Sequence, residues 1–278
     1  MYPKGTAMNN NRLDIELFQR GLCKSRERAR QLIKNGNVMT DGTVCIKPSF
    51  IINDDTDIQV SGDIHKYVGR GGLKLEKALS YFEISVDGLV CVDIGASTGG
   101  FTDCMLQNGA AKVYALDVGH SQLDEFLLND KRVINMEKMN IRETVISDFN
   151  DTINFIATDV SFISLKLVIP KIKELLMPDG ESVVLIKPQF EAGKGNINKT
   201  GLVKNPHIHR QILNDITQFA KETGFIIAGL CVSPIKGGSG NSEYLMYLKK
   251  LSDLLVQSQY KYNIDGLIKE VFTEGRKK

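Results

Sequence analysis

The chain of 278 residues carries 35 basic and 33 acidic side chains, a formal net charge of +2 at pH 7. With 42% hydrophobic and 24% charged residues, it has the composition of a folded globular protein, which excludes a largely disordered chain. It contains no apolar run of membrane-helix length, no signal-peptide pattern near Met1, and five cysteines without a C-x-x-C pair. These features predict a cytoplasmic protein with reduced thiols, and its length predicts one large domain and a smaller module.

The overall charge balance hides a basic stretch near the N-terminus. Residues 20–34 hold six basic side chains and one acidic side chain. Capping and stop signals predict a helix over 25–35, and on it Arg26, Arg30 and Lys34 recur every four residues and share one face. Such a face is either a solvated surface or a binding site for a polyanion.

Residues 10–60 are predicted to form a compact α+β module of two short helices followed by short strands. This order resembles the alpha-L RNA-binding domain of a small-subunit ribosomal protein. The resemblance is carried by Arg12-Leu13-Asp14, the Ser25-Arg26-x-x-Ala29 helix start, Gly36-x-Val38 and the turn at Gly42. It implies that RNA is the polyanion, and it implies RNA contacts for Arg12, Arg20, Lys24, Arg26, Arg30 and Lys34.

A basic, glycine-rich linker is predicted over 61–72, and the remaining residues, 73–278, are predicted to form the large domain. Seven strand-like apolar runs alternate there with helix-like segments. The runs are 89–94, 113–117, 133–136, 153–158, 182–186, 225–232 and 244–248. This alternation predicts an α/β fold: a doubly wound, mainly parallel sheet with helices on both faces.

The strongest local pattern spans 92–102, where a buried strand leads into a glycine-rich turn and then into a helix. Glycines let the backbone approach a ligand closely, and a helix N-terminus favours a carboxylate. Asp93 before the turn suits a cationic amine, and Asp117 at the end of the next strand suits the hydroxyls of a ribose. Ser97 stands where the dinucleotide fingerprint requires glycine. Amine, carboxylate and ribose together describe S-adenosylmethionine; the alternative is a purely structural turn.

Charged side chains end the fourth and fifth strands. Asp159 ends the fourth, and 160–162 lack the proline-rich aromatic motif of enzymes that methylate exocyclic amines. None of the five cysteines is placed for the nucleophile of pyrimidine-carbon methylation. Lys187 closes the fifth strand, which Pro188 terminates, so its ammonium is expected beside Asp159. The alternative is a lysine that extends into solvent.

Lys74 and Glu243 complete a pattern with Asp159 and Lys187. Their Lys-Asp-Lys-Glu order resembles the FtsJ-like ribose 2′-O-methyltransferases. With the RNA-binding module in front, the chain from residue 12 to about 249 resembles the TlyA, or hemolysin-A-like, family of two-domain rRNA 2′-O-methyltransferases. The matching strings are 68–75, 93–103, 159–164, 186–191 and 240–244.

The resemblance implies S-adenosylmethionine as cofactor and ribosomal RNA as partner, with a cytidine ribose as target on an assembled subunit and neither metal nor membrane involved. It implies cofactor contacts for Asp93, Gly95, Ala96, Ser97, Gly99, Gly100, Phe101, Asp117, Asn140 and Asp159. RNA contacts near the active site are expected from Arg70, Lys194 and Lys199, the last two in a basic loop. Met139 departs from the small polar residue expected before Asn140.

The four charges predict a mechanism. Lys187 is the candidate base for the 2′-hydroxyl, and its neutral form is favoured by Lys74 and by the cationic cofactor. Asp159 and Glu243 fix the ammonium groups and balance their charge. Lys74 contacting the target ribose or phosphate is an open alternative.

The sequence argues against three rival functions. A membrane-active hemolysin requires an insertion segment that the sequence lacks. A dehydrogenase fails at Ser97, and it has no residue suited to hydride transfer near the strand ends. A non-catalytic RNA-binding protein needs only the N-terminal module, but the complete set of four charges favours an enzyme.

Overall fold

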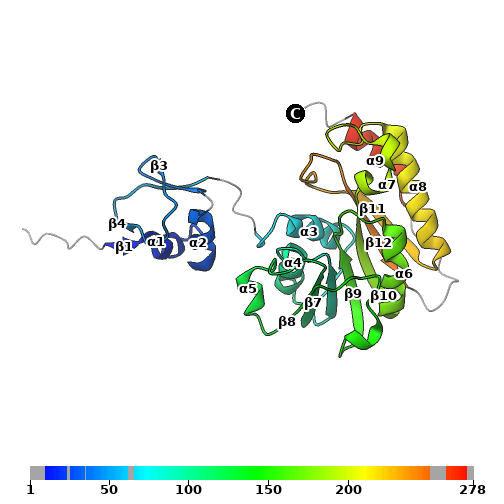
Figure 1. The fold of residues 1–278 in the computed structure, drawn as a ribbon, viewed down its shortest axis with the longest axis horizontal. Coiled ribbons are helices and arrows are strands. Elements are labelled where there is room, and N and C mark those ends of the chain that lie inside the picture. The colour runs from blue at the N-terminus through cyan, green and yellow to red at the C-terminus, as the bar shows by residue number, and fades with distance from the viewer. Residues whose placement is uncertain (1–9, 24–25, 35, 62–65, 251–260, 274–278) are drawn as a thin grey trace, which may run out of the picture. The chain divides into compact units, whose positions relative to one another are not determined.

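The computed structural model describes residues 10–23, 26–34, 36–61, 66–250 and 261–273. It divides into two compact units, Met1–His65 and Lys66–Lys278. Figure 1 shows the helices and strands of each unit. Among the residues described, no helix is both long enough and apolar enough to cross a membrane.

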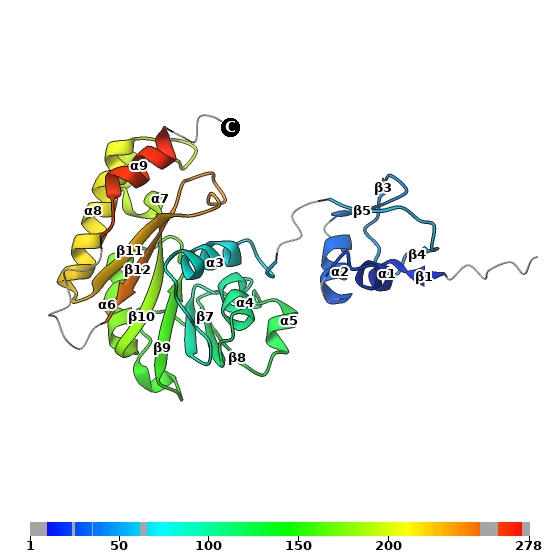
Figure 2. The ribbon, with the colours of Figure 1, turned by 180° about the vertical axis from the view of Figure 1, so that it is seen from behind.

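The N-terminal unit is a small α+β module, as the sequence predicts (Figure 2). Helices α1 (Leu13–Gln19) and α2 (Arg26–Lys34) pack through Leu13, Leu17, Ala29 and Ile33, all fully buried. Strands β3 (Thr43–Val44), β2 (Val38–Thr40) and β5 (Ile58–Val60) form an antiparallel sheet in that order. The sequence did not predict β1 (Asn11–Arg12) and β4 (Ile51–Ile52), which pair with each other.

The large unit is built on a seven-stranded sheet in the order β11-β12-β10-β9-β6-β7-β8. Its strands are β6 (Val90–Ile94), β7 (Lys112–Asp117), β8 (Val133–Glu137), β9 (Ile153–Thr158), β10 (Leu176–Ile186), β11 (Ile226–Val232) and β12 (Tyr244–Lys249). Neighbouring strands are parallel, except that β12 runs antiparallel to both β10 and β11. All seven predicted strands are present, so the predicted fold class is confirmed.

Helices cover both faces of this sheet, because successive side chains of each buried strand point to opposite faces. Cys91 packs under α3 (Gly71–Tyr81) and α4 (Gly100–Gln107). Its neighbour Val92 packs under α6 (Leu165–Leu175), α8 (Pro206–Glu222) and α9 (Ile264–Phe272). Both faces of the central strands are therefore buried, which explains their nearly continuous apolar sequence.

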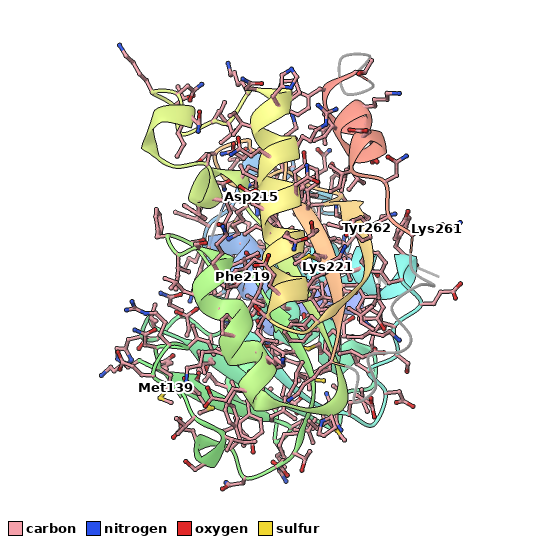
Figure 3. The ribbon with its side chains drawn as sticks, turned by 90° about the vertical axis from the view of Figure 1, so that its right-hand side faces the viewer. Met139, Asp215, Phe219, Lys221, Lys261 and Tyr262 are labelled. Atoms are coloured by element: carbon pink, nitrogen blue, oxygen red, sulfur yellow. The ribbon has the colours of Figure 1, made fainter. Side chains whose placement is uncertain are left out.

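Figure 3 looks onto the face that α8 and α6 cover. Phe219 and Lys221 of α8 are labelled there, and the Nζ of Lys221 lies 5.5 Å from the centre of the Tyr262 ring. Tyr262 precedes α9, so this contact helps to hold the last helix against α8.

The large unit begins before the predicted domain start at residue 73. Tyr67 is 2% exposed and belongs to the core beneath α3 and α4. The N–H of Val68 donates to Oδ2 of Asp103 in α4 at 2.8 Å. Residues 66–72 of the predicted linker therefore pack as part of this unit, and α3 begins at Gly71.

Candidate active site

Four parallel strands, β7, β6, β9 and β10, end at one edge of the sheet, where ligands of doubly wound folds bind. A cavity of about 690 Å³ lies at this edge. It is lined by Ile94, Gly95 and Ser97 around the end of β6, by Leu116–Val118 and Gln122 around the end of β7, by 139–142 after β8, and by 159–164 and Leu167 after β9. The structure therefore forms one binding site from segments far apart in the sequence.

The glycine-rich turn between β6 and α4 lies tightly against its neighbours. Gly95 has φ +85°, and a Cβ there would come 2.8 Å from the backbone oxygen of Asp159. Gly99 has φ +94°, and a Cβ there would come 2.1 Å from Cδ1 of Leu127 in α5 (Glu125–Leu128). Both positions require glycine, for backbone conformation and for space.

Asp93, from which the sequence predicts an amine contact, lies beneath this turn and is not among the residues that line the cavity. Its carboxylate is fully buried, and Oδ2 accepts hydrogen bonds from the N–H of Thr102 at 2.8 Å and from its hydroxyl at 2.7 Å. Burial raises the pKa of Asp93 to about 7, against the opposing effect of these hydrogen bonds. Asp93 thus fastens the first turn of α4 to the end of β6.

Asp117 stands at the cavity wall, where the sequence predicts a ribose contact. Its Oδ2 accepts from the N–H of Ser97 at 2.8 Å, and its Oδ1 accepts from the N–H of Gly119 at 2.7 Å. The bond from Ser97 joins the turn after β6 to the end of β7, and the bond from Gly119 fixes the turn after β7. A carboxylate oxygen can accept more than one hydrogen bond, so hydroxyl groups can still bind here.

The predicted cofactor residues divide into two groups. Those that line the cavity are Gly95, Ser97, Asp117, Asn140 and Asp159. Those that do not line it are Asp93, Ala96, Gly99, Gly100 and Phe101, which form or support the turn. The sequence reasoning missed Val118, Gln122, Ile141 and Arg142, which line the cavity but follow no motif.

The four predicted catalytic charges lie together beside the cavity. The Nζ of Lys187 is 2.6 Å from Oδ1 of Asp159. The Nζ of Lys74 is 2.7 Å from Oε2 of Glu243 and 3.3 Å from Oδ2 of Asp159. None of the four side chains is more than 17% exposed. Buried charges persist when they are paired, and here two ammonium groups meet two carboxylates.

Neighbouring residues hold this charge cluster in place. Lys187 also donates to the hydroxyl of Ser161 at 2.9 Å, and Gln189 donates to Oε1 of Glu243 at 3.4 Å. A Cβ at Gly237 would lie 2.3 Å from the same Oε1. Gly237, earlier in the loop that leads to β12, therefore packs directly against the carboxylate of Glu243.

Phe162, three residues after Asp159, was not predicted as a site residue. It lines the cavity, is 92% exposed and has φ +62°, a rare conformation for an aromatic residue. Its ring lies 4.9 Å from that of Phe190, which follows Lys187 in the chain. An aromatic pair therefore stands beside the charge cluster.

The basic face of the N-terminal unit is partly an internal ion cluster. Asp14 is fully buried and accepts hydrogen bonds from Nε of Arg12 at 2.9 Å, of Arg26 at 3.0 Å and of Arg30 at 3.0 Å. Burial alone would raise the pKa of Asp14, but the three arginines outweigh it and lower the pKa to about 2. Arg20 similarly binds Glu16 at 2.8 Å. These arginines support the fold of the unit, which the sequence prediction did not include.

Of the other predicted RNA-binding residues, the structure describes the side chains of three. Lys34 is exposed at the end of α2, and Arg70 and Lys199 are exposed on the large unit. Lys24 and the Ser25 cap lie outside the described residues, and so does the side chain of Lys194. In the predicted basic loop, Asn198 Oδ1 accepts from the N–H groups of Thr200 and Leu202, at 3.0 and 2.8 Å, and forms a turn.

The fold and this site define a methyltransferase of the doubly wound α/β class. The FtsJ-like methyltransferase family matches residues 67–250, and the S4 domain matches residues 11–58. The chain therefore belongs to the FtsJ-like methyltransferase family and carries an S4 domain ahead of its methyltransferase domain.

Curated relatives match along nearly the whole chain. Hemolysin A of Brachyspira hyodysenteriae is 44% identical over 85% of this chain and 98% of that protein. The 16S/23S rRNA (cytidine-2'-O)-methyltransferase TlyA of Mycobacterium tuberculosis is 38% identical over 95% of this chain and 98% of that protein. A solved structure from Streptococcus thermophilus, provisionally named a hemolysin, has a TM-score of 0.73 and 42% identity, covering 98% of both chains. These matches confirm the family resemblance predicted from the sequence.

Proposed function

We propose that this protein transfers the methyl group of S-adenosylmethionine to the 2′-hydroxyl of a cytidine ribose in ribosomal RNA. The observation that carries this proposal is the cluster of Lys74, Asp159, Lys187 and Glu243 beside a cavity of cofactor size. Membership of the FtsJ-like methyltransferase family supports the reaction class. The names of the TlyA relatives support the target.

The cavity fits S-adenosylmethionine in size and in the chemistry of its lining. Asp117 would accept hydrogen bonds from the ribose hydroxyls, and the turn at Gly95 and Ser97 would receive the methionine part. Met139, Asn140 and Ile141 would border the adenine. When bound, the cofactor supplies an electrophilic methyl group on a sulfonium.

The charge cluster would manage the single proton of the reaction. The cofactor would supply the methyl group to the 2′-oxygen, and Nζ of Lys187, once it had given up its own proton, would accept the proton of the hydroxyl. Asp159, 2.6 Å from that nitrogen, holds it in position and stabilises the ammonium that forms. Lys74, between Asp159 and Glu243, keeps Asp159 in place and adds positive charge near the base. Alignment of oxygen with methyl supplies much of the remaining rate.

The substrate is proposed to be ribosomal RNA within an assembled subunit, modified in the cytoplasm and without a metal. The S4 domain would bind phosphates, with Lys34 and the arginines around Asp14 on its basic face. Arg70, Lys194 and Lys199 would contact RNA from the methyltransferase domain. The S4 domain alone would suffice for a non-catalytic RNA-binding protein; the buried charge cluster favours an enzyme.

The test is transfer of tritium from methyl-labelled S-adenosylmethionine to purified ribosomal subunits. The RNA would then be digested, and the labelled nucleosides identified by mass spectrometry. We expect label in 2′-O-methylcytidine. RNA binding without label would indicate a binding protein, label on a base would contradict ribose chemistry, and dye release from lipid vesicles without label would indicate a membrane-active protein.

A further inference from the structure

The segment that follows β10 holds the loop that follows β9 at both of its ends. At the beginning of the loop, Lys187 contacts Asp159 at 2.6 Å and Ser161 at 2.9 Å. At its end, Glu191 accepts a hydrogen bond from the hydroxyl of Ser164 at 2.6 Å, and its other oxygen accepts from the N–H of Leu165 at 2.8 Å. The proposed function assigns no role to Glu191.

This loop is a wall of the cofactor cavity, since residues 159–164 all line it. Phe162, in the middle of the loop, has φ +62°, and a side chain in this left-handed conformation persists only where surrounding contacts enforce it. The ring of Phe190, one residue before Glu191, contacts Phe162. Release of one end of the loop would allow the wall to relax.

The role of Glu191 differs from that of an ordinary helix cap. Helix α6 already has Ser164 as its N-cap, whose Oγ accepts from the N–H of Lys166 at 3.2 Å. Glu191 reaches this cap from α7 (Pro188–Glu191), four residues after Lys187. The two side chains lie on the same short segment, so the segment fixes the spacing between the cavity wall and the candidate base.

We propose that Glu191 is a positioning residue that holds the wall of the cofactor cavity and, through that loop, aligns Asp159 with Lys187. The inference rests on the proposed function for its cofactor. It predicts that loss of Glu191 weakens cofactor binding and slows transfer at saturating cofactor, beyond any general loss of stability.

The experiment compares three variants of the full-length protein with wild type. E191A removes both contacts. E191Q keeps them, because the amide oxygen accepts from Leu165 and the amide nitrogen donates to the Ser164 hydroxyl. N263A is the matched control: Asn263 accepts from the N–H of Gly266 at the start of α9, and it does not line the cavity. Affinity for S-adenosylhomocysteine, melting temperature and kcat at saturating cofactor are measured.

We expect E191A to bind S-adenosylhomocysteine about tenfold more weakly than wild type, the effect of one or two lost hydrogen bonds, and to have a lower kcat. N263A should lose a similar amount of thermal stability with unchanged affinity, and E191Q should recover both affinity and kcat. If E191A does not fold, E191D, which is too short to reach both partners, takes its place.

The role of Glu191 would be overturned if E191A kept the affinity and kcat of wild type. It would also be overturned if N263A lost as much affinity and kcat as E191A, or if E191Q did not recover them. If wild type itself does not bind S-adenosylhomocysteine, the proposed function falls together with this inference. The two failures are therefore distinguishable.

Discussion

At the scale of single residues, the candidate active site depends on one carboxylate shared by two lysines. Asp159 contacts Lys187 through Oδ1 and Lys74 through Oδ2, while Glu243 holds the far side of Lys74. Lys187 also contacts a second residue of the loop that lines the cavity, Ser161, at 2.9 Å. Of the two lysines, Lys187 is therefore the one held to the cavity wall at two residues, which favours it as the candidate base.

The change Lys187→Ala should abolish methyl transfer, to below about 1% of wild type, because general-base assistance contributes about 10²–10⁴-fold. The variant should still bind S-adenosylhomocysteine, with affinity lowered by no more than about tenfold, because Lys187 does not line the cavity and acts on it only through Asp159 and Ser161. Tritium transfer and calorimetry measure the two quantities, with K131A, an exposed lysine before β8, as control. Retained transfer would show that catalysis relies on alignment of the 2′-oxygen with the methyl group and not on Lys187 as a base.

Asp117→Ala should have the opposite effect, with weaker cofactor binding and a smaller change in kcat. Its two oxygens hold the N–H groups of Ser97 and Gly119, and the proposed ribose bonds are lost as well. Each unpaired partner costs about 1–3 kcal/mol, so affinity should fall at least tenfold. Calorimetry with D151A as control, an aspartate that does not line the cavity, checks this. Equal affinities of D117A and wild type would exclude a ribose contact.

Some residue contacts follow from sequence and others do not. The proximity of Asp159 and Lys187 was predictable because both follow parallel strands that end at one edge of the sheet. Asp93 also stands near a strand end, yet its side chain points under α4, and the pairing with Thr102 depends on the packing of that helix. Glu191 was visible only as part of a family string, since its partners lie 26 and 27 residues away.

At the scale of elements, α1 and α2 are joined by an ion cluster around the buried Asp14 as well as by apolar packing. Asp14 of α1 pairs with Arg26 and Arg30 of α2. Counting charges along α2 alone gave a basic face, because the acid that partly neutralises it lies on the preceding helix. The short strands β1 and β4, of two residues each, were likewise missed, because two residues show no periodicity.

This cluster predicts acid sensitivity of the N-terminal unit. The folded-state pKa of Asp14, about 2, is below its reference value of 3.8, so ionised Asp14 stabilises the fold above pH 4. That contribution, about 2 kcal/mol, is lost as the pH falls from about 4 to 2. Methyl NMR signals of Leu13 and Ile33 report folding of this unit in the full chain. D14N should be less stable at neutral pH and should lose less stability than wild type across this window, the rest of the loss coming from Glu16, whose pKa its hydrogen bond with Arg20 also lowers. A pH response as large as that of wild type would exclude Asp14 as the cause.

At the scale of the whole molecule, the two units carry separate parts of the proposed function. Every residue that lines the cofactor cavity belongs to the large unit, and the arginine cluster belongs to the small one. The division of labour was predictable from sequence, because each unit has its own core pattern and its own motifs. RNA affinity and cofactor affinity should therefore respond to different substitutions.

The triple change R26A/R30A/K34A should weaken binding to ribosomal subunits. The slope of log affinity against log salt concentration should fall by the amount that about three phosphate contacts contribute. Affinity for S-adenosylhomocysteine should not change, because the cavity is lined entirely from the other unit. Arg26 and Arg30 also pair with Asp14, so a companion variant adds D14N and removes the carboxylate that the triple change leaves underpaired. Binding is titrated at several salt concentrations for both variants. If lost phosphate contacts are the cause, both variants should show the same reduced salt slope. A wild-type slope in the companion variant alone would mean that the triple change weakens RNA binding by unfolding the S4 domain. A wild-type slope in both variants would assign RNA binding to the methyltransferase domain.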